Sequence, residues 1–279
     1  MTVSRRKLLL MAPAMLGAPM IARAAVPFRF GLTPVFLDSD ATVIDRLRAA
    51  LSTERGIDLV QRRTYAEITG LLLEGDVDAA WLCGYPYLQH EEELSLLAVP
   101  VWQGAPLYRS YLITHNDDPA SGLPDLIDGM HAFSDPNSNS GFLVTASDLA
   151  RMGTRPETFF SRTIFAYGHR NVVRAVAQGL TRSGSVDGYV WEALTSVEPG
   201  LTTRTRVIAK SELLGFPPFV ARRDRADQPD LARFKQALLG LRETAVGQDA
   251  LVLLQLDDVV ETTPALFDGI RARMRDVAG

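Results

Sequence analysis

The chain of 279 residues is 47% hydrophobic and 22% charged, which is typical of a globular protein long enough for one large domain or two modest ones. Its formal net charge is −4, and it becomes −8 when the first 24 residues, with four cations and no acid, are set aside; an acidic body without a Lys/Arg stripe argues against nucleic acid and anionic membrane surfaces as partners. The single cysteine, Cys83, excludes an internal disulfide and a zinc centre of several thiolates, and no other metal site or cofactor is expected.

The first 24 residues have the organisation of a secretory signal peptide. A basic start precedes an apolar run, and the small-x-small sequence Ala22-Arg23-Ala24 follows as a cleavage site. The pair Arg5-Arg6 resembles the twin-arginine export signal, but Leu8 replaces the usual phenylalanine, so the ordinary export route stays open. We expect cleavage near Ala24 and a soluble, exported mature protein.

The next part of the chain alternates strand and helix signals. The segments "FRFGLTP" (28–34) and "GIDLVQRR" (56–63) are typical of strands, and the segment between them has apolar residues at helical spacing. A second helix is predicted over 64–75, with a T-x-x-E capping box at its start and a glycine at its end. The apolar run "DVDAAWLCG" (76–84) then predicts a strand covered on both faces. This order indicates an α/β architecture with mainly parallel sheets.

A weak internal repeat suggests two similar lobes. Residues 69–81 and 177–191 both read as a helix, a glycine, a Val-Asp pair and a strand with tryptophan. Asp187, in the second Val-Asp pair, is therefore expected at the start of a strand. Because ligands of open α/β sheets sit beyond the carboxyl ends of the strands, two facing lobes would hold one ligand in a cleft between them.

Two segments look like chain crossings between the lobes, namely 107–118 and 205–224. They divide the mature chain into a first lobe of 25–110 and 215–279 and a second lobe of 111–214. The C-terminal third is expected to be two amphipathic helices, with "LDDVVETTP" between them.

The stretch "SDPNSNSGF" (134–142) lies between a short apolar strand and a helix. Ser, Asn and Asp favour helix N-caps, which is the simpler interpretation. A helix start lined with hydroxyls and free amides is also suited to an anion, and Ser138, Asn139 and Ser140 each offer a backbone amide and a polar side chain. On the residues alone, both interpretations stay open.

Several motifs together resemble one family. They are "VDAAWLCGYPY", "RSYLITH", "SDPNSNSGFLV", "GHRNVVRAVAQG", "VDGYVWEAL" and "FPPFVARRD", and they span most of the mature chain. In this order they resemble the phosphate/phosphite/phosphonate-binding proteins, which are periplasmic components of ATP-driven importers with a two-lobe type II periplasmic-binding-protein fold. The resemblance implies a periplasmic, non-catalytic and monomeric protein, with a small oxyanion and a membrane permease as partners.

In this family the Ser-x-Ser stretch opens a helix whose amides and hydroxyls grip a tetrahedral oxyanion, which favours the ligand interpretation of Ser138 to Ser140. The resemblance also implies that His169 reaches the ligand from the same lobe, where protonation near its ordinary pKa of ~6.5 would add charge attraction. Tyr65 and Tyr87 match family tyrosines that close the cleft from the first lobe.

The same resemblance bears on four further residues. Tyr189 and Trp191 come after the second Val-Asp pair and are expected to line the cleft from the second lobe. Asp187 is expected to be structural, although acids near this region hold the ligand's amine in aminophosphonate binders. Cys83 stands where phosphonate binders have a small or apolar residue, and it is either an inert buried thiol or a ligand for thiophilic arsenic, as in arsenite sensors of this family.

The sequence also bears on three other functions. The chain has no G-x-S-x-G elbow, P-loop or dinucleotide fingerprint, so the sequence does not indicate an enzyme. An aromatic cage for a cationic amine could use Trp81, Tyr85, Tyr87, Tyr189 and Trp191, but it leaves "SDPNSNSG" unexplained. A sensor subunit that reports to a membrane histidine kinase is a further alternative to an importer component.

Overall fold

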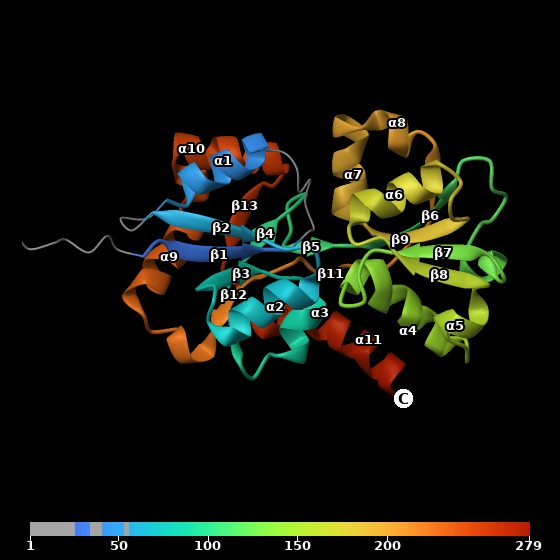
Figure 1. Cartoon of the computed structure of the whole chain (residues 1–279), viewed down its shortest axis with the longest axis horizontal. Helices are drawn as coiled ribbons and strands as arrows, with labels where there is room; N and C mark the ends of the chain where they lie inside the picture. Colours follow the sequence, from blue (N-terminus) through green and yellow to red (C-terminus); the bar gives the residue numbers. More distant parts are fainter. Residues whose placement is uncertain (1–25, 34–40, 53–55) are drawn as a thin grey trace, which may run out of the picture.

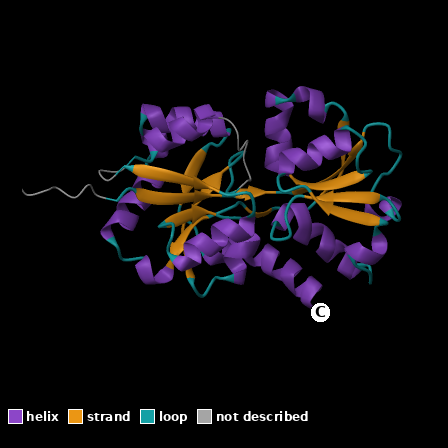
Figure 2. Ribbon diagram, in the orientation of Figure 1, coloured by secondary structure: helices purple, strands orange, loops and turns teal. Residues whose placement is uncertain are grey.

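Two lobes lie side by side, each a sheet with helices on both faces (Figures 1 and 2). The structure is a computed structural model that describes residues 26–33, 41–52 and 56–279. The expected signal peptide of residues 1–24 lies outside the described residues. Within the described part, no helix combines the length and the apolar character needed to cross a membrane.

The first lobe contains a six-stranded sheet in the order β13-β4-β12-β3-β1-β2. Its strands are β1 (Phe28–Leu32), β2 (Ile57–Gln61), β3 (Ala79–Trp81), β4 (Leu94–Val101), β12 (Phe219–Arg222) and β13 (Asp258–Val260). One face carries α1 (Ala41–Ala50) and α10 (Ala245–Leu254), and the other carries α2 (Tyr65–Glu74) and α3 (Gly84–Gln89), with α9 (Pro229–Leu239) at the far end (Figure 1).

The second lobe contains a five-stranded sheet in the order β10-β6-β9-β7-β8. Its strands are β6 (Ser110–His115), β7 (Met130–Phe133), β8 (Arg162–Phe165), β9 (Ser183–Asp187) and β10 (Thr205–Lys210). One face carries α6 (His169–Ala177), α7 (Gly188–Val197) and α8 (Pro199–Thr202), and the other carries α4 (Val144–Arg151) and α5 (Pro156–Phe159) (Figure 1).

The junction of the lobes is a two-stranded sheet of β5 (Leu107–Tyr108) and β11 (Leu214–Gly215) (Figure 1). Both strands fall within the segments expected as crossings, while the lobe boundaries at 110/111 and 214/215 stay a prediction. Short 3-10 turns occupy Leu123–Leu126, Arg223–Arg225, Leu241–Glu243 and Pro264–Phe267, and a π-helical turn occupies Asn139–Leu143.

The expectation of mainly parallel sheets needs a correction, because both sheets are mixed. Three strands run parallel in each, β2-β1-β3 and β8-β7-β9. The remaining pairings are antiparallel. The reason is the connection between the lobes. In the first lobe, β4 leads out toward the junction and β12 returns from it, so β4 and β12 run in opposite directions. In the second lobe, β6 enters and β10 leaves, so these two strands are also antiparallel.

The α2 helix begins and ends where the sequence predicts. The Thr64 hydroxyl accepts a hydrogen bond from Glu67 N, and the Glu67 carboxylate accepts from Thr64 N at 2.9 Å, which completes the capping box. Gly75 ends the helix in the left-handed conformation with φ of 81°, which glycine adopts without steric cost. This boundary fixes Tyr65 as the first residue of the helix, facing the second lobe.

Two expectations about the chain order are wrong. The C-terminal third has three helices, α9, α10 and α11 (Asp268–Ala278), and the segment expected as a connector contains β13, which pairs with β4. Thr244 starts the extra helix by accepting from Gly247 N at 3.0 Å. Asp187 ends strand β9 instead of starting a strand, because its carboxylate caps α7.

The α11 helix connects the first lobe with α4 of the second lobe (Figure 1). Arg273 on α11 is 3% exposed. Its guanidinium donates to the Val144 carbonyl at 3.0 Å, to Asp148 at 2.7 Å, and to both carboxylate oxygens of Glu212 at 2.8 and 2.5 Å. One side chain therefore ties α11 to the start of α4 and to the chain crossing.

We predict that Arg273→Ala lowers the free energy of unfolding by about 2–4 kcal/mol, because it leaves one carbonyl and two carboxylates without their donor. Urea denaturation followed by circular dichroism measures this. The control is Arg233→Ala, which removes a surface pair with Asp230 and is expected to cost less than ~1 kcal/mol. Equal losses for the two variants would contradict the assigned role of Arg273.

Candidate functional site

The Ser138–Ser140 stretch forms a tight turn between β7 and α4. The Ser138 hydroxyl accepts a hydrogen bond from Gly141 N at 2.9 Å, and the Asp135 carboxylate accepts from Asn137 N at 2.8 Å. Side chains of the turn therefore do cap backbone N–H groups, as the simpler interpretation of this stretch predicts. The turn is nevertheless buried at the face that meets the first lobe, as the low exposure of Ser138, Asn139 and Ser140 shows. An ordinary surface helix cap would be exposed to solvent.

Gly141 is required by close packing behind this turn. A Cβ atom at this position would lie 1.9 Å from the Ser134 hydroxyl oxygen and 3.0 Å from His169 Cε1. Since real Cβ atoms do not approach so closely, only glycine allows the turn to lie against the histidine.

His169 is the first residue of α6 and follows Gly168, whose φ of 143° is open only to glycine. The backbone N–H of Asp187 donates to His169 Nδ1 at 3.0 Å, so the ring hydrogen is on Nε2. Nε2 lies 3.1 Å from the Tyr65 hydroxyl of the first lobe. Burial lowers the pKa of His169 to about 3, so the expectation of protonation near ~6.5 is wrong for this arrangement, and the imidazole is a neutral donor.

Further hydrogen bonds cross between the lobes next to this pair. Asn139 N donates to Cys83 Sγ at 3.2 Å, and Tyr65 N donates to the Asp135 carboxylate at 3.2 Å. The Asn139 side-chain amide donates to the Tyr108 hydroxyl at 2.8 Å. Sequence reasoning missed Tyr108: its segment was expected as a crossing, but nothing in the sequence distinguishes its hydroxyl from those of the other tyrosines.

Asp187 lies at the meeting point of β9 and α7. Its Oδ1 accepts from Tyr189 N at 2.9 Å and from Val190 N at 3.4 Å, and its carboxyl also hydrogen-bonds with the Ser140 hydroxyl. Burial raises the pKa of Asp187 to about 7. Together these contacts define what we term the interlobe cluster, which consists of Tyr65, Cys83, Tyr108, Ser138, Asn139, Ser140, His169 and Asp187.

The Cys83 thiol is protonated in this cluster. Burial raises its pKa to about 12, although the N–H of Asn139 acts in the opposite direction. The thiol is thus a weak hydrogen-bond acceptor between the lobes. Among the described residues, no group of three or more His, Cys, Asp or Glu side chains could hold a metal ion.

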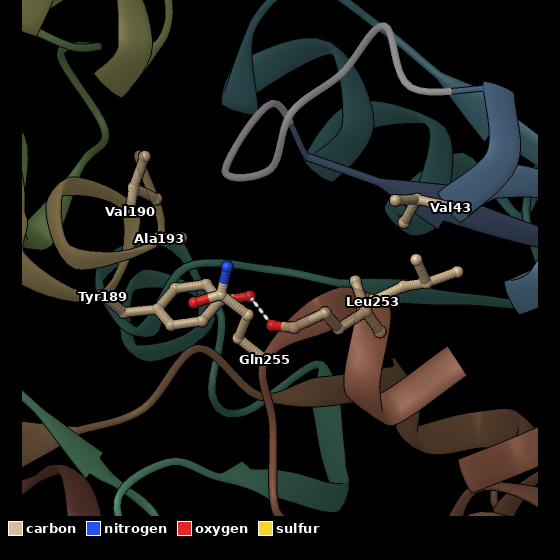
Figure 3. Close-up of a pocket in the computed structure, with 7 residues that line it drawn as sticks. Val43, Tyr189, Val190, Ala193, Leu253 and Gln255 are labelled. Atoms are coloured by element: carbon tan, nitrogen blue, oxygen red, sulfur yellow. Dashed lines mark hydrogen bonds between the residues drawn. The ribbon is translucent and has the colours of Figure 1, made fainter. Parts of the chain in front are cut away.

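Three of the expected ligand contacts have their partners elsewhere. Tyr87 packs edge-on against Phe267. The Tyr189 hydroxyl donates to the Leu254 carbonyl at the end of α10, beside Gln255 (Figure 3). Trp191 is half-buried, and its indole N–H donates to a threonine hydroxyl of its own lobe at 3.2 Å. A ligand contact by any of the three stays a prediction.

Four of the five rings named for an aromatic cage pack against aromatic rings outside that set. Trp81 packs against Phe219, Tyr87 against Phe267, Tyr189 against Phe216, and Trp191 against Tyr111. These four rings therefore have different aromatic neighbours, which gives no support to a site for a quaternary amine.

Two buried polar atoms at the turn have no hydrogen-bond partner in the described structure. They are the side-chain carbonyl oxygen of Asn139 and the hydroxyl oxygen of Ser134. Buried polar atoms are nearly always paired, so both atoms are open to a further partner at this turn.

We predict that Gly141→Ala destabilises the protein by about 1–3 kcal/mol, because the added methyl group pushes Ser134 and His169 out of place. Thermal or urea unfolding measures the loss. Gly70→Ala is the matched control, since a Cβ there meets nothing within 4 Å and the residue lies inside α2. That change is expected to be neutral or stabilising by up to ~1 kcal/mol. Equal behaviour of the two variants would refute the packing argument.

Comparison with known proteins shows which proteins this chain resembles. The family model for the phosphonate ABC transporter, periplasmic substrate-binding protein, matches residues 30–267. The phosphonates-binding periplasmic protein of Escherichia coli is 31% identical over 128 residues, which cover 44% of this chain and 38% of that protein.

Solved structures show the same fold. A binding protein component of an ABC phosphonate transporter from Pseudomonas aeruginosa superposes with a TM-score of 0.82 at 22% identity, over 90% of this chain and 88% of that one. A Prochlorococcus marinus protein in complex with methylphosphonate gives a TM-score of 0.78 at 16% identity, over 92% and 99% of the two chains. The two-lobe type II periplasmic-binding fold and the resemblance noted from the sequence motifs are confirmed: the chain belongs to the family of periplasmic substrate-binding proteins of phosphonate ABC transporters.

Proposed function

We propose that the protein captures a small oxyanion of the phosphonate, phosphite or phosphate type between its lobes and delivers it to the membrane permease of an ATP-driven importer. The observation that carries this proposal is a pair of contacts across a buried interface: His169 with Tyr65, and the Ser138–Ser140 turn, through Asn139 N, with Cys83. These residues come from both lobes, so one small ligand placed among them would touch both.

The available donors suit an oxyanion. His169 Nε2–H, the Tyr65 hydroxyl and the Ser140 hydroxyl are neutral donors from different elements. They lie at helix starts, where backbone dipoles favour negative charge: Tyr65 opens α2, His169 opens α6, and the serine turn leads into α4. A ligand oxygen would replace the present protein partners of these groups. Neutral donors in a dry site can hold an anion without Lys or Arg.

The assignment implies transport without catalysis. We infer that the mature chain works in the periplasm as a monomer after cleavage near Ala24, with no cofactor. A protein that reports to a sensor kinase would need a feature that favours signalling, and neither the Cys83 thiol, held in its protonated form, nor any other described contact provides one.

A thermal-shift screen tests the ligand class directly. Phosphate, phosphite, methylphosphonate, sulfate, arsenite and choline are compared at equal concentration. A ligand at 100 times its Kd adds ~2.7 kcal/mol to the free energy of unfolding. Stabilisation by phosphorus oxyanions supports the proposal, and stabilisation by choline alone would overturn it.

We predict that Ser140→Ala weakens oxyanion binding by about ten- to a hundredfold, the loss of one hydrogen bond to a charged group. Isothermal titration calorimetry with methylphosphonate measures it. The control is Ser161→Ala, which removes an exposed hydroxyl outside the cluster and is expected to leave Kd unchanged. An unchanged Kd for Ser140→Ala, in a variant with unchanged melting temperature, would show that this hydroxyl only packs.

We also predict that the lobes move apart to admit the ligand. Every side chain of the interlobe cluster is buried, so no ligand can reach it in the present arrangement. The junction strands β5 and β11 join the lobes and are the expected hinge. Small-angle scattering should show a smaller radius of gyration at saturating methylphosphonate than without ligand. An identical radius in both conditions would count against the hinge.

A further inference from the structure

A second contact joins the lobes beside the Tyr65–His169 pair. Arg63 lies two residues before Tyr65, and Tyr167 lies two residues before His169. The guanidinium carbon of Arg63 stands 5.4 Å from the centre of the Tyr167 ring, which is the geometry of a cation–π contact. Arg63 is exposed and Tyr167 is half-buried, so this contact lies on the solvent side of the buried pair.

The sheet topology places the Arg63–Tyr167 contact far from the hinge. Arg63 follows β2 and Tyr167 follows β8, and each of these strands is at the edge of its sheet. In the first sheet β1 and β3 separate β2 from β12, and in the second sheet β7 and β9 separate β8 from β6. Since β12 and β6 are the strands next to the junction in the chain, the turns after β2 and β8 should separate most when the lobes open. The contact therefore marks the mouth of the cleft.

The backbone around Tyr167 holds the ring in this place. Tyr167 has a φ of 49°, a left-handed conformation that is uncommon for a residue with a large side chain. Ala166 N donates to the Phe133 carbonyl at 2.8 Å, and Gly168 N donates to the Ser134 carbonyl at 3.3 Å. Hydrogen bonds on both sides thus fix the strained residue, and such strain is retained where the surroundings impose it. The same bonds tie the Tyr167 turn to the end of β7, from which the serine turn starts.

The charge of Arg63 suits an entering anion. The chain has a net charge of −4, and the interlobe cluster contains neither Lys nor Arg, so the cluster itself does not attract an anion from a distance. In water at low salt, one guanidinium ~5 Å from a mono- or dianion raises the local concentration of that anion about four- to sixteenfold. Arg63 therefore offers, at the mouth of the cleft, the positive charge that the cluster lacks.

We propose that Arg63 is an entry site for the oxyanion and that the Tyr167 ring takes up its guanidinium when the lobes close. This inference rests on the proposed function and deepens it. In the open arrangement the guanidinium draws the anion to the mouth. In the closed arrangement it stacks on the ring, outside the cluster that holds the ligand. Arg63 thus sets how fast the ligand binds, and the Arg63–Tyr167 contact slows its release.

Stopped-flow kinetics of the mature protein with methylphosphonate separate these two roles. Tryptophan fluorescence reports closure, because the Trp102 ring meets the Tyr189 ring of the other lobe at 5.7 Å. Arg63→Gln should lower the association rate constant about three- to tenfold at ~10 mM salt. The difference from the wild type should shrink below about twofold at ~0.5 M salt, where the charge is screened.

The variant Tyr167→Leu keeps the cation and the left-handed backbone but removes the ring. Its association rate constant should stay within about twofold of the wild type, because the charge at the mouth is intact. Its dissociation rate constant should rise about two- to fivefold, which corresponds to the loss of one exposed cation–π contact. A residue that only supports the fold would not divide the two rate constants in this way.

Two matched variants are the controls. Arg62→Gln removes the same charge from the neighbouring residue, whose guanidinium donates to the Gln61 carbonyl at 2.8 Å, and it should lower the association rate constant less than about twofold. Tyr167→Phe keeps the ring face, so both of its rate constants should match those of the wild type.

Equal association rate constants for the wild type and Arg63→Gln at low salt would overturn the entry site. An equal loss in Arg62→Gln would do the same, since it would reduce the effect to net charge. An unchanged dissociation rate constant in Tyr167→Leu would overturn the role of the ring. In each of these outcomes methylphosphonate still binds, so the proposed function survives. If no oxyanion binds to the wild type, the proposed function itself fails, and the entry site fails with it.

Discussion

The hydrogen bond between His169 Nε2 and the Tyr65 hydroxyl is the contact on which the rest of the interlobe arrangement depends. It joins the first residue of α2 to the first residue of α6, and the backbone N–H of Asp187, which holds Nδ1 as an acceptor, sets its direction. The imidazole thus has one fixed tautomer, and its single donor points out of the second lobe toward the first. A reversed tautomer would leave two donors facing each other at Asp187 N and Nδ1, whereas the Tyr65 hydroxyl can donate as well as accept.

Helix starts supply the positive potential that side chains do not. The α2, α4, α6 and α7 helices all begin at this interface, as expected where the carboxyl ends of strands from two sheets meet. Two of these starts already hold a carboxyl group, since Asp135 accepts from the first N–H of α2 and Asp187 caps α7. The start of α6 and the serine turn that leads into α4 hold no carboxyl group, and together with the Tyr65 hydroxyl they are the groups that the proposed function assigns to the oxyanion.

The parts that sequence reasoning predicted are those set by local chemistry. The α2 boundaries follow from Thr64, Glu67 and Gly75, and the position of the serine turn follows from its own composition. What it missed depends on packing between distant segments. The Tyr108–Asn139 contact needs both lobes in place, and the role of Asp187 was misread because a Val-Asp pair looks the same before a strand and at its end. Likewise, the Tyr189 hydroxyl finds the Leu254 carbonyl only through the meeting of α7 and α10.

Ligand selectivity at such a site depends on which buried hydrogen-bond donors a ligand leaves unpaired. In the closed arrangement most donors of the cluster already have protein partners, such as Cys83 Sγ for Asn139 N and Tyr108 for the Asn139 amide, so a ligand gains only the difference between its own hydrogen bonds and those it replaces. A ligand that lacks one acceptor leaves a buried donor unpaired, which costs about 1–3 kcal/mol. This penalty does not grow with the size of the buried area. Under the proposed function, the lobes would close tightly on one class of oxyanion and bind others of the same size more weakly.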